Sequence, residues 1–193
     1  EEDPHAIADG KACCSLSAVE DARRVAAQLD IPYYVMNFKD IFKEKVVDYF
    51  QEEYLQGRTP NPCIACNRYI KFDALLEKAI SMVIDYVATG HYARIEYNSG
   101  SGRYIIKKAT DRHKDQTYVL YNLNQEQLKR TLLPLGDYTK DEVRQMAEDM
   151  GLQIASKPDS QEICFVPDND YAGFIERNRG EAIEPGNFVD IYG

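Results

Sequence analysis

Two cysteines three residues apart form the first pattern with chemical meaning. Cys63 and Cys66 follow the turn "GRTPNP", and apolar side chains recur at helical spacing after them. The positive end of a helix dipole lowers the pKa of a thiol at the helix start, and Arg68 and Lys71 add positive charge nearby. A C-x-x-C pair serves redox chemistry, zinc binding and iron–sulfur ligation alike. The pattern therefore indicates a reactive or metal-binding thiol site.

The other three cysteines are scattered. Cys164 stands alone in the polar loop "PDSQEICFVPD", where it is either reactive or a small buried apolar side chain. Cys13 and Cys14 precede the first predicted helix, and we expect no chemical role for either. Five is an odd number, and a chain of 193 residues does not need disulfides to hold its core. The pattern favours metal binding or catalysis over a disulfide framework.

Two further groups of residues lie at the ends of predicted secondary-structure elements and are candidates for binding. Gly90 and His91 close the apolar stretch "MVIDYVATGH", which predicts a strand followed by a tight turn. Lys114, Asp115 and Gln116 begin "KDQTYVLYNL", where spacing alone predicts only a solvated helix start. Ligands of parallel sheets bind beyond the carboxyl ends of the strands, so the end of the stretch at Gly90 is a candidate ligand-binding edge.

The elements that must position these residues alternate along the chain. Apolar runs predict strands at 31–38 and 82–91, and residues 91–111 predict a hairpin with a Gly/Ser turn. Helical spacing is found over residues 17–30, 38–57, 63–80, 114–136 and 139–151. This order predicts an α/β fold, a parallel sheet with helices on both faces.

Composition limits the class of protein. No apolar run approaches the roughly 18 residues of a membrane span, and the acidic start "EEDPHAIADG" is unlike a secretory signal peptide. We therefore expect a cytoplasmic protein with no membrane partner. The net charge of −9 argues against indiscriminate binding of nucleic acid, but a local basic patch remains compatible with a nucleic-acid partner.

Four ordered motifs carry a family resemblance. The segments "GRTPNPCIACNRYIKF", "YVATGHYARI", "KDQTYVLYNL" and "SKPDSQEICFV" resemble the tRNA-specific 2-thiouridylase family, from about residue 13 to the end. The resemblance implies a Rossmann-like PP-loop ATPase domain with a helical tRNA-binding insertion. It also implies ATP with Mg²⁺, a tRNA substrate and a sulfur-donor protein, either a cysteine desulfurase or a relay. The implied reaction replaces the C2 oxygen of the wobble uridine with sulfur.

The resemblance also implies residue roles. Cys66 matches the nucleophile and Cys164 the cysteine that bears a persulfide, with a disulfide between them after transfer. The remaining matches are Asn61, Pro62 and Cys63 beside the target base, Gly90 at the nucleotide, and His91, Lys114, Asp115 and Gln116 at the tRNA. We expect Cys66 and Cys164 to share one cleft lined by Cys63 and His91, with a movable loop at 157–168.

Two departures from the family pattern bear on these expectations. Many members carry Asp where this chain has Cys63, which leaves the proton-transfer group open. The phosphate-binding loop "SGGVDSS" is not in the sequence, so we expect residues 1–182 to be part of a catalytic domain and 183–193 to begin a β-rich second domain.

Two alternatives use the same thiols differently. An iron–sulfur cluster on Cys63, Cys66 and Cys164 would bind sulfide at an open iron. A binding module with a structural zinc would need those three cysteines plus His91 or one of Cys13 and Cys14.

Overall fold

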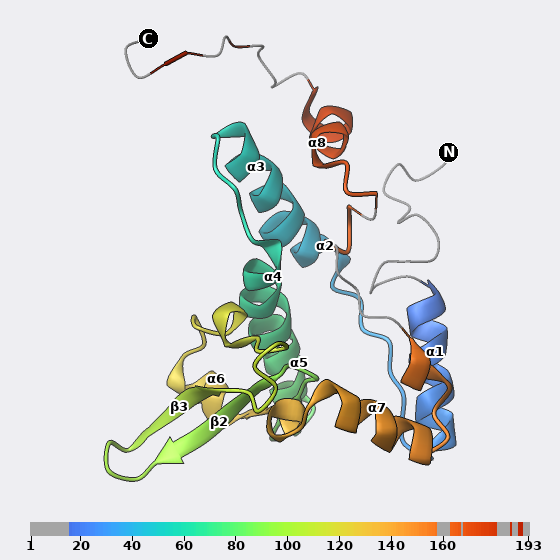
Figure 1. The fold of residues 1–193 in the computed structure, drawn as a ribbon. Coiled ribbons are helices and arrows are strands. Elements are labelled where there is room, and N and C mark those ends of the chain that lie inside the picture. Colours follow the sequence, from blue (N-terminus) through green and yellow to red (C-terminus); the bar gives the residue numbers. More distant parts are fainter. Residues whose placement is uncertain (1–15, 158–162, 167, 181–185, 187–188, 191–193) are drawn as a thin grey trace.

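The computed structural model describes residues 16–157, 163–166, 168–180, 186 and 189–190 (Figure 1). Its α-helices are α1 (Leu16–Gln28), α2 (Lys39–Phe42), α3 (Tyr49–Leu55), α4 (Pro62–Ala65), α5 (Leu75–Ser81), α6 (Gln125–Lys129), α7 (Lys140–Asp149) and α8 (Tyr171–Arg179). Two π-helical stretches, η1 (Lys43–Asp48) and η2 (Cys66–Ala74), and three 3₁₀ turns, η3 (Thr117–Val119), η4 (Pro134–Asp137) and η5 (Gln153–Ser156), complete the helical elements. The strands are β1 (Val87–Ala88), β2 (Ala93–Asn98), β3 (Arg103–Lys108) and β4 (Thr131–Leu132).

Two small sheets organise the strands. β1 pairs in parallel with β4, with Val87 opposite Thr131, and β2 pairs with β3 as the antiparallel hairpin that the sequence predicts. A parallel pair requires a long crossover between its strands. Here residues 89–130 form that crossover, and they contain the hairpin, η3 and α6. The α/β class is confirmed, and the insertion between β1 and β4 combines a hairpin with helical turns.

Two helical runs meet near the centre of the molecule, where the first part of one packs against the first part of the other. One is continuous from α2 through η1 to α3, and the other from α4 through η2 to α5 (Figure 1). Val46 of the first run packs against Ala65 and Ile70 of the second. Gly57 ends the first run with φ +73°, a conformation that favours glycine, as the sequence predicts.

Three sequence predictions about strands and helices are wrong, one entirely and two in extent. No strand forms at 31–38, where Tyr34 and Val35 are 68% and 66% exposed. An extended segment becomes a strand only when a neighbouring chain satisfies its backbone N–H and C=O groups, and no described segment pairs with this one. The strand predicted at 82–91 is reduced to β1, because a helix-terminating turn takes residues 82–84.

The third error concerns residues 114–136, where one mostly helical segment was expected. Only η3, α6 and part of η4 are helical there. Thr131 and Leu132 instead join the parallel sheet, fixed by hydrogen bonds from Val87 N–H to Arg130 O and from Thr89 N–H to Leu132 O. Long-range pairing with β1 therefore overrides local helical spacing.

On the right-hand side of Figure 1, α1 contacts the segment that follows α7. The Gln28 side chain at the end of α1 donates to Met150 O at 3.0 Å, just after α7, and Lys157 pairs with Asp21 at 2.6 Å. Helix α7 begins with a capping box formed by Thr139 and Glu142. Within the described residues, no helix is both long and apolar enough to cross a membrane.

Candidate functional site

Asn61 builds the start of the helix that carries the C-x-x-C pair. Its side-chain Oδ1 accepts the backbone N–H of Cys63 at 3.0 Å and that of Ile64 at 3.4 Å. Pro62 is buried at the first helical position, where a missing N–H costs nothing. Cys63 is exposed in this first turn. Asn61 and Pro62 thus fix the backbone of the helical turn in which Cys63 lies.

Cys66 begins the π-helical stretch η2 and is half-buried. It packs against the cluster of Val46, Ala65 and Ile70, which lies between the two central helical runs. A π-helical stretch turns side chains away from ordinary helical spacing and is frequent at functional sites. The Cys66 side chain therefore lies against an apolar wall rather than in bulk solvent.

Cys164 is placed by its neighbour Phe165. The Phe165 ring contacts Phe50 at 5.2 Å and Phe42 at 5.8 Å, both edge-on, and it also packs against the cluster beside Cys66. Val166 is buried, which also holds the segment 163–166 in place. Two segments far apart in sequence, one carrying Cys66 and one carrying Cys164, thus meet at one apolar cluster.

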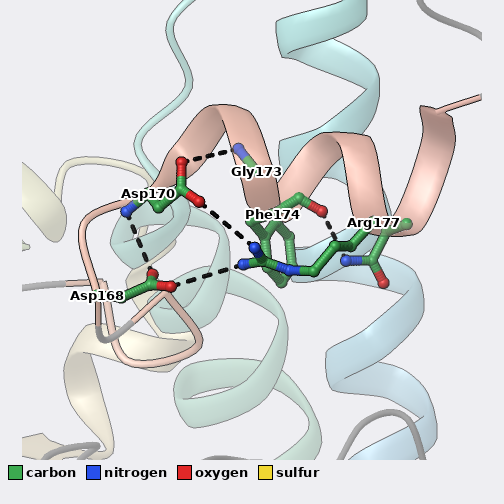
Figure 2. Close-up of polar contacts among 6 residues, drawn as sticks. Asp168, Asp170, Gly173, Phe174 and Arg177 are labelled. Atoms are coloured by element: carbon green, nitrogen blue, oxygen red, sulfur yellow. Dashed lines mark hydrogen bonds and ion pairs between the residues drawn. The ribbon is translucent and has the colours of Figure 1, made fainter.

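Helix α8 anchors the chain that follows Cys164. Figure 2 shows Asp170 capping the helix by accepting the Gly173 N–H at 2.9 Å, while Arg177 reaches Asp170 at 3.4 Å and Asp168 at 3.6 Å. The Phe174 ring lies 5.5 Å from the Phe165 ring. The predicted loop at 157–168 is described only in part, since 158–162 and 167 lie outside the described residues.

His91 is buried at 7% exposure, one residue after the exposed Gly90. Its Nδ1 lies 2.7 Å from Thr89 Oγ1, and its ring packs at 6.0 Å from Phe72 of η2. Burial, helped by the charge of Lys71, lowers the pKa of His91 to about 4. The ring is therefore neutral at pH 7, and a tRNA contact by His91 stays a prediction.

Asp115 and Gln116 have their side chains engaged within the protein. Asp115 accepts the Ala109 N–H at 2.8 Å and the Thr117 hydroxyl at 2.6 Å, while Gln116 Oε1 accepts the Tyr92 N–H at 3.0 Å. Burial raises the pKa of Asp115, but these hydrogen bonds outweigh it and the pKa is lowered. Both side chains position the turn before η3, and Lys114 is half-buried beside them.

A buried residue that the sequence did not single out links these parts. Asn67, directly after Cys66, is 2% exposed and donates from Nδ2 to Val119 O of η3 at 3.3 Å, while its Oδ1 has no hydrogen-bond partner among the described residues. The sequence contains a signal for this residue: an Asn on the apolar face of a predicted helix needs a buried hydrogen-bond partner. Asn67 joins the Cys66 helix to the turn that holds Asp115 and Gln116.

The cysteines that the structure describes, Cys63, Cys66 and Cys164, do not form a metal-binding group with one another or with His91. Among the residues that the structure describes, no group of three or more His, Cys, Asp or Glu lies close enough to hold a metal ion. Cys63, Cys66, Cys164 and His91 are all described, whereas Cys13 and Cys14 lie outside the described residues. We therefore derive no step through an iron–sulfur cluster or a zinc ion.

Comparison with known proteins assigns the class. Residues 1–168 match the family model described as the tRNA methyl transferase HUP domain, and the chain belongs to this family. Among curated proteins, the tRNA-specific 2-thiouridylase MnmA of Carboxydothermus hydrogenoformans is 65% identical over 181 residues, covering 94% of this chain and 50% of that protein. The tRNA-specific 2-thiouridylase MnmA 1 of Thermoanaerobacter pseudethanolicus is 63% identical over 193 residues, covering 100% of this chain and 53% of that protein. The chain spans about half the length of the curated relatives it matches.

Proposed function

We propose that this chain is part of a tRNA sulfurtransferase that thiolates the wobble uridine at C2. The names of the relatives, at 61–65% identity, support the substrate and the reaction. The observation that carries the proposal is the meeting of the Cys66 and Cys164 segments at the cluster around Val46 and Phe165. Residues 1–182 would belong to the catalytic domain and 183–193 to the start of a second domain.

The two thiols would divide the sulfur transfer. Cys164 would carry a persulfide whose outer sulfur attacks the activated C2 carbon of the uridine. The Cys66 thiolate would then attack the Cys164 sulfur, which breaks the S–S bond and leaves sulfur on the base. The product is a Cys66–Cys164 disulfide, which a thiol reductant must return to two thiols. Asn61, Pro62 and Cys63 would form the rigid turn beside the base.

ATP would supply adenylation of the C2 oxygen, which makes that oxygen a good leaving group. Gly90 fits a nucleotide contact, because it is exposed at the carboxyl end of a parallel strand. A Cβ on Gly90 would meet only Leu135, at an ordinary 3.6 Å, so the space beside it is open. Mg²⁺ would accompany the phosphates.

The tRNA, the sulfur donor and the cell compartment complete the proposal. His91, Lys114, Asp115 and Gln116 lie on the insertion between β1 and β4 and would hold the tRNA, with the Asp115 and Gln116 side chains acting through the turn they fix. A cysteine desulfurase or relay protein would load Cys164. The protein would work in the cytoplasm.

Substitution of the two thiols tests the proposal. In the intact protein, Cys66→Ser and Cys164→Ser should each abolish ATP-dependent formation of 2-thiouridine in tRNA, because serine can neither bear a persulfide nor form the disulfide. Cys13→Ser and Cys14→Ser are the matched controls and should keep near-normal turnover. Near-normal turnover of Cys164→Ser would show that the persulfide is not on this residue.

A further inference from the structure

A cavity of about 380 Å³ lies away from the thiol site, between the β2–β3 hairpin and α6. Its lining includes Tyr97, Arg103, Tyr104, Gln125, Glu126 and Lys129. None of these residues belongs to the candidate site described above. Figure 1 shows the hairpin and α6 together at one end of the molecule, far from α1.

Two tyrosines form one wall of this cavity. The rings of Tyr97 and Tyr104 lie 5.1 Å apart at a tilt of 55°. Tyr104 is half-buried and packs against the core cluster around Leu120 and Leu128, so its position is fixed. Tyr97 is 54% exposed, which leaves part of its ring open to a ligand.

The opposite wall is held at a fixed position by Gln125. Its side-chain amide accepts the Tyr104 N–H at 2.8 Å and donates to Tyr104 O at 3.0 Å, as a neighbouring strand would. Lys129 lies one turn further along α6, on the same face as Gln125. The hydrogen bonds of Gln125 therefore set the position of α6, which carries Lys129, relative to β3, which carries Arg103.

The charge of the region is opposite to that of the chain. Residues 89–130 contain eight Lys or Arg and four Asp or Glu, a net charge of +4, whereas the whole chain carries −9. Within the described part of the chain, no ion pair joins Arg103 or Lys129 to a carboxylate, although Lys107 pairs with Glu96 on the same hairpin. Tyr118 and Tyr121 on this insertion are also exposed, at 60% and 70%.

We propose that the cavity binds one unpaired nucleotide of an RNA substrate, with the base against Tyr97 and a phosphate between Arg103 and Lys129. Proteins that bind single-stranded RNA stack bases on aromatic rings beside cations that contact the backbone. The assignment rests on the proposed function, because it takes the tRNA as the RNA. It adds a second contact point, outside the thiol site, on the inserted hairpin.

Salt dependence of binding tests the phosphate contact. The intact protein is titrated with a tRNA transcript between 50 and 200 mM salt, and log Kd is plotted against log salt concentration. Arg103→Gln and Lys129→Gln should each lower the slope by about one unit, because each removes one phosphate contact. Arg23→Gln removes an exposed arginine from α1 and is the matched control, with an unchanged slope.

The base contact is tested at Tyr97. Tyr97→Ala should weaken tRNA binding by about 5- to 100-fold through lost stacking, whereas Tyr97→Phe keeps the ring and should bind as the wild type does. Suppose that the wild type binds tRNA and that the variants Tyr97→Ala, Arg103→Gln and Lys129→Gln all have the affinity and salt slope of the wild type. The cavity is then not an RNA site, and the proposed function still stands. If the wild type does not bind tRNA, both the cavity assignment and the proposed function are wrong.

Discussion

Asn61 and Asp115 use short polar side chains to fix backbone near the candidate site. Asn61 accepts two backbone N–H groups at the start of α4, and Asp115 accepts from Ala109 and Thr117 before η3. Such local hydrogen bonds are the reason that Asn and Asp favour caps and turns. These motif residues therefore have a structural role, because Asn61 fixes the backbone at Cys63 and Asp115 fixes the turn before η3.

His91 gives a prediction at the scale of one residue. Its folded pKa of about 4 lies below the ordinary histidine value of 6.5, so between these two pH values the unfolded chain binds more protons than the folded one. Its contribution to stability is complete above pH 6.5 and falls as pH decreases toward 4. The free-energy advantage of wild type over His91→Gln should shrink by about 2 kcal/mol from pH 7 to pH 5 in urea unfolding.

The control for this experiment is His113→Gln, which changes an exposed histidine. A constant difference between wild type and His91→Gln across pH 5 to 7 would mean that His91 is protonated as readily in the folded protein as in the unfolded chain.

At the scale of an element, three helices end at a residue with positive φ. Gly57 and Gly151 both adopt positive φ after α3 and α7, where the backbone doubles back to bond the last carbonyls. Val83 occupies the equivalent position after α5 with φ +61°, and the N–H groups of Val83 and Ile84 bond Ile80 O and Ala79 O. A β-branched residue is strained in this conformation.

Relief of this strain is a testable consequence. Val83 is 92% exposed, so its side chain contributes little packing, and Val83→Gly should raise the free energy of unfolding by about 1 kcal/mol. The matched change is Gly57→Ala, which should lower the free energy of unfolding by about 1 kcal/mol. A Cβ at Gly57 meets nothing within 4 Å, so the cost comes from the positive φ alone. Urea unfolding measures both. A Val83→Gly protein no more stable than wild type would contradict the strain.

At the scale of the whole molecule, one aromatic cluster joins distant parts of the chain. Phe50 contacts Phe165 at 5.2 Å and Phe174 at 6.1 Å, so α3 holds both the Cys164 segment and α8. Figure 1 shows α8 lying beside α3. Edge-on ring pairs add about 0.5–1.5 kcal/mol each beyond buried area. This cluster brings the Cys164 segment to the Cys66 helix.

Loosening the cluster should therefore expose Cys164. Phe165→Ala should lower stability by about 2 kcal/mol and raise the rate at which iodoacetamide labels Cys164 by about tenfold, because the segment undocks more often. Peptide mass spectrometry after timed labelling gives the rate. Tyr34→Ala removes an aromatic ring that is 68% exposed and is the control. Equal labelling of Cys164 in wild type and Phe165→Ala would show that Phe165 does not hold the segment.

The α/β class, the hairpin, most helices and their ends, and the family can all be predicted from the amino-acid sequence. These depend on local rules: helical spacing, the Thr139 capping box, Gly57 and Gly151 at helix ends, and short ordered motifs. Such signals are read within a few residues, so no knowledge of distant contacts is needed to predict them.

Which residues meet and which strands form depends on contacts between distant segments. The segment 31–38 has strand-like residues but no described partner, whereas Thr131 and Leu132, predicted helical, gained one in β1. The roles of Asn67 and Phe165 also depend on contacts more than 50 residues away, with Val119 and with Phe50. Backbone pairing and side-chain packing are satisfied between distant segments, and local spacing does not encode which segments those are.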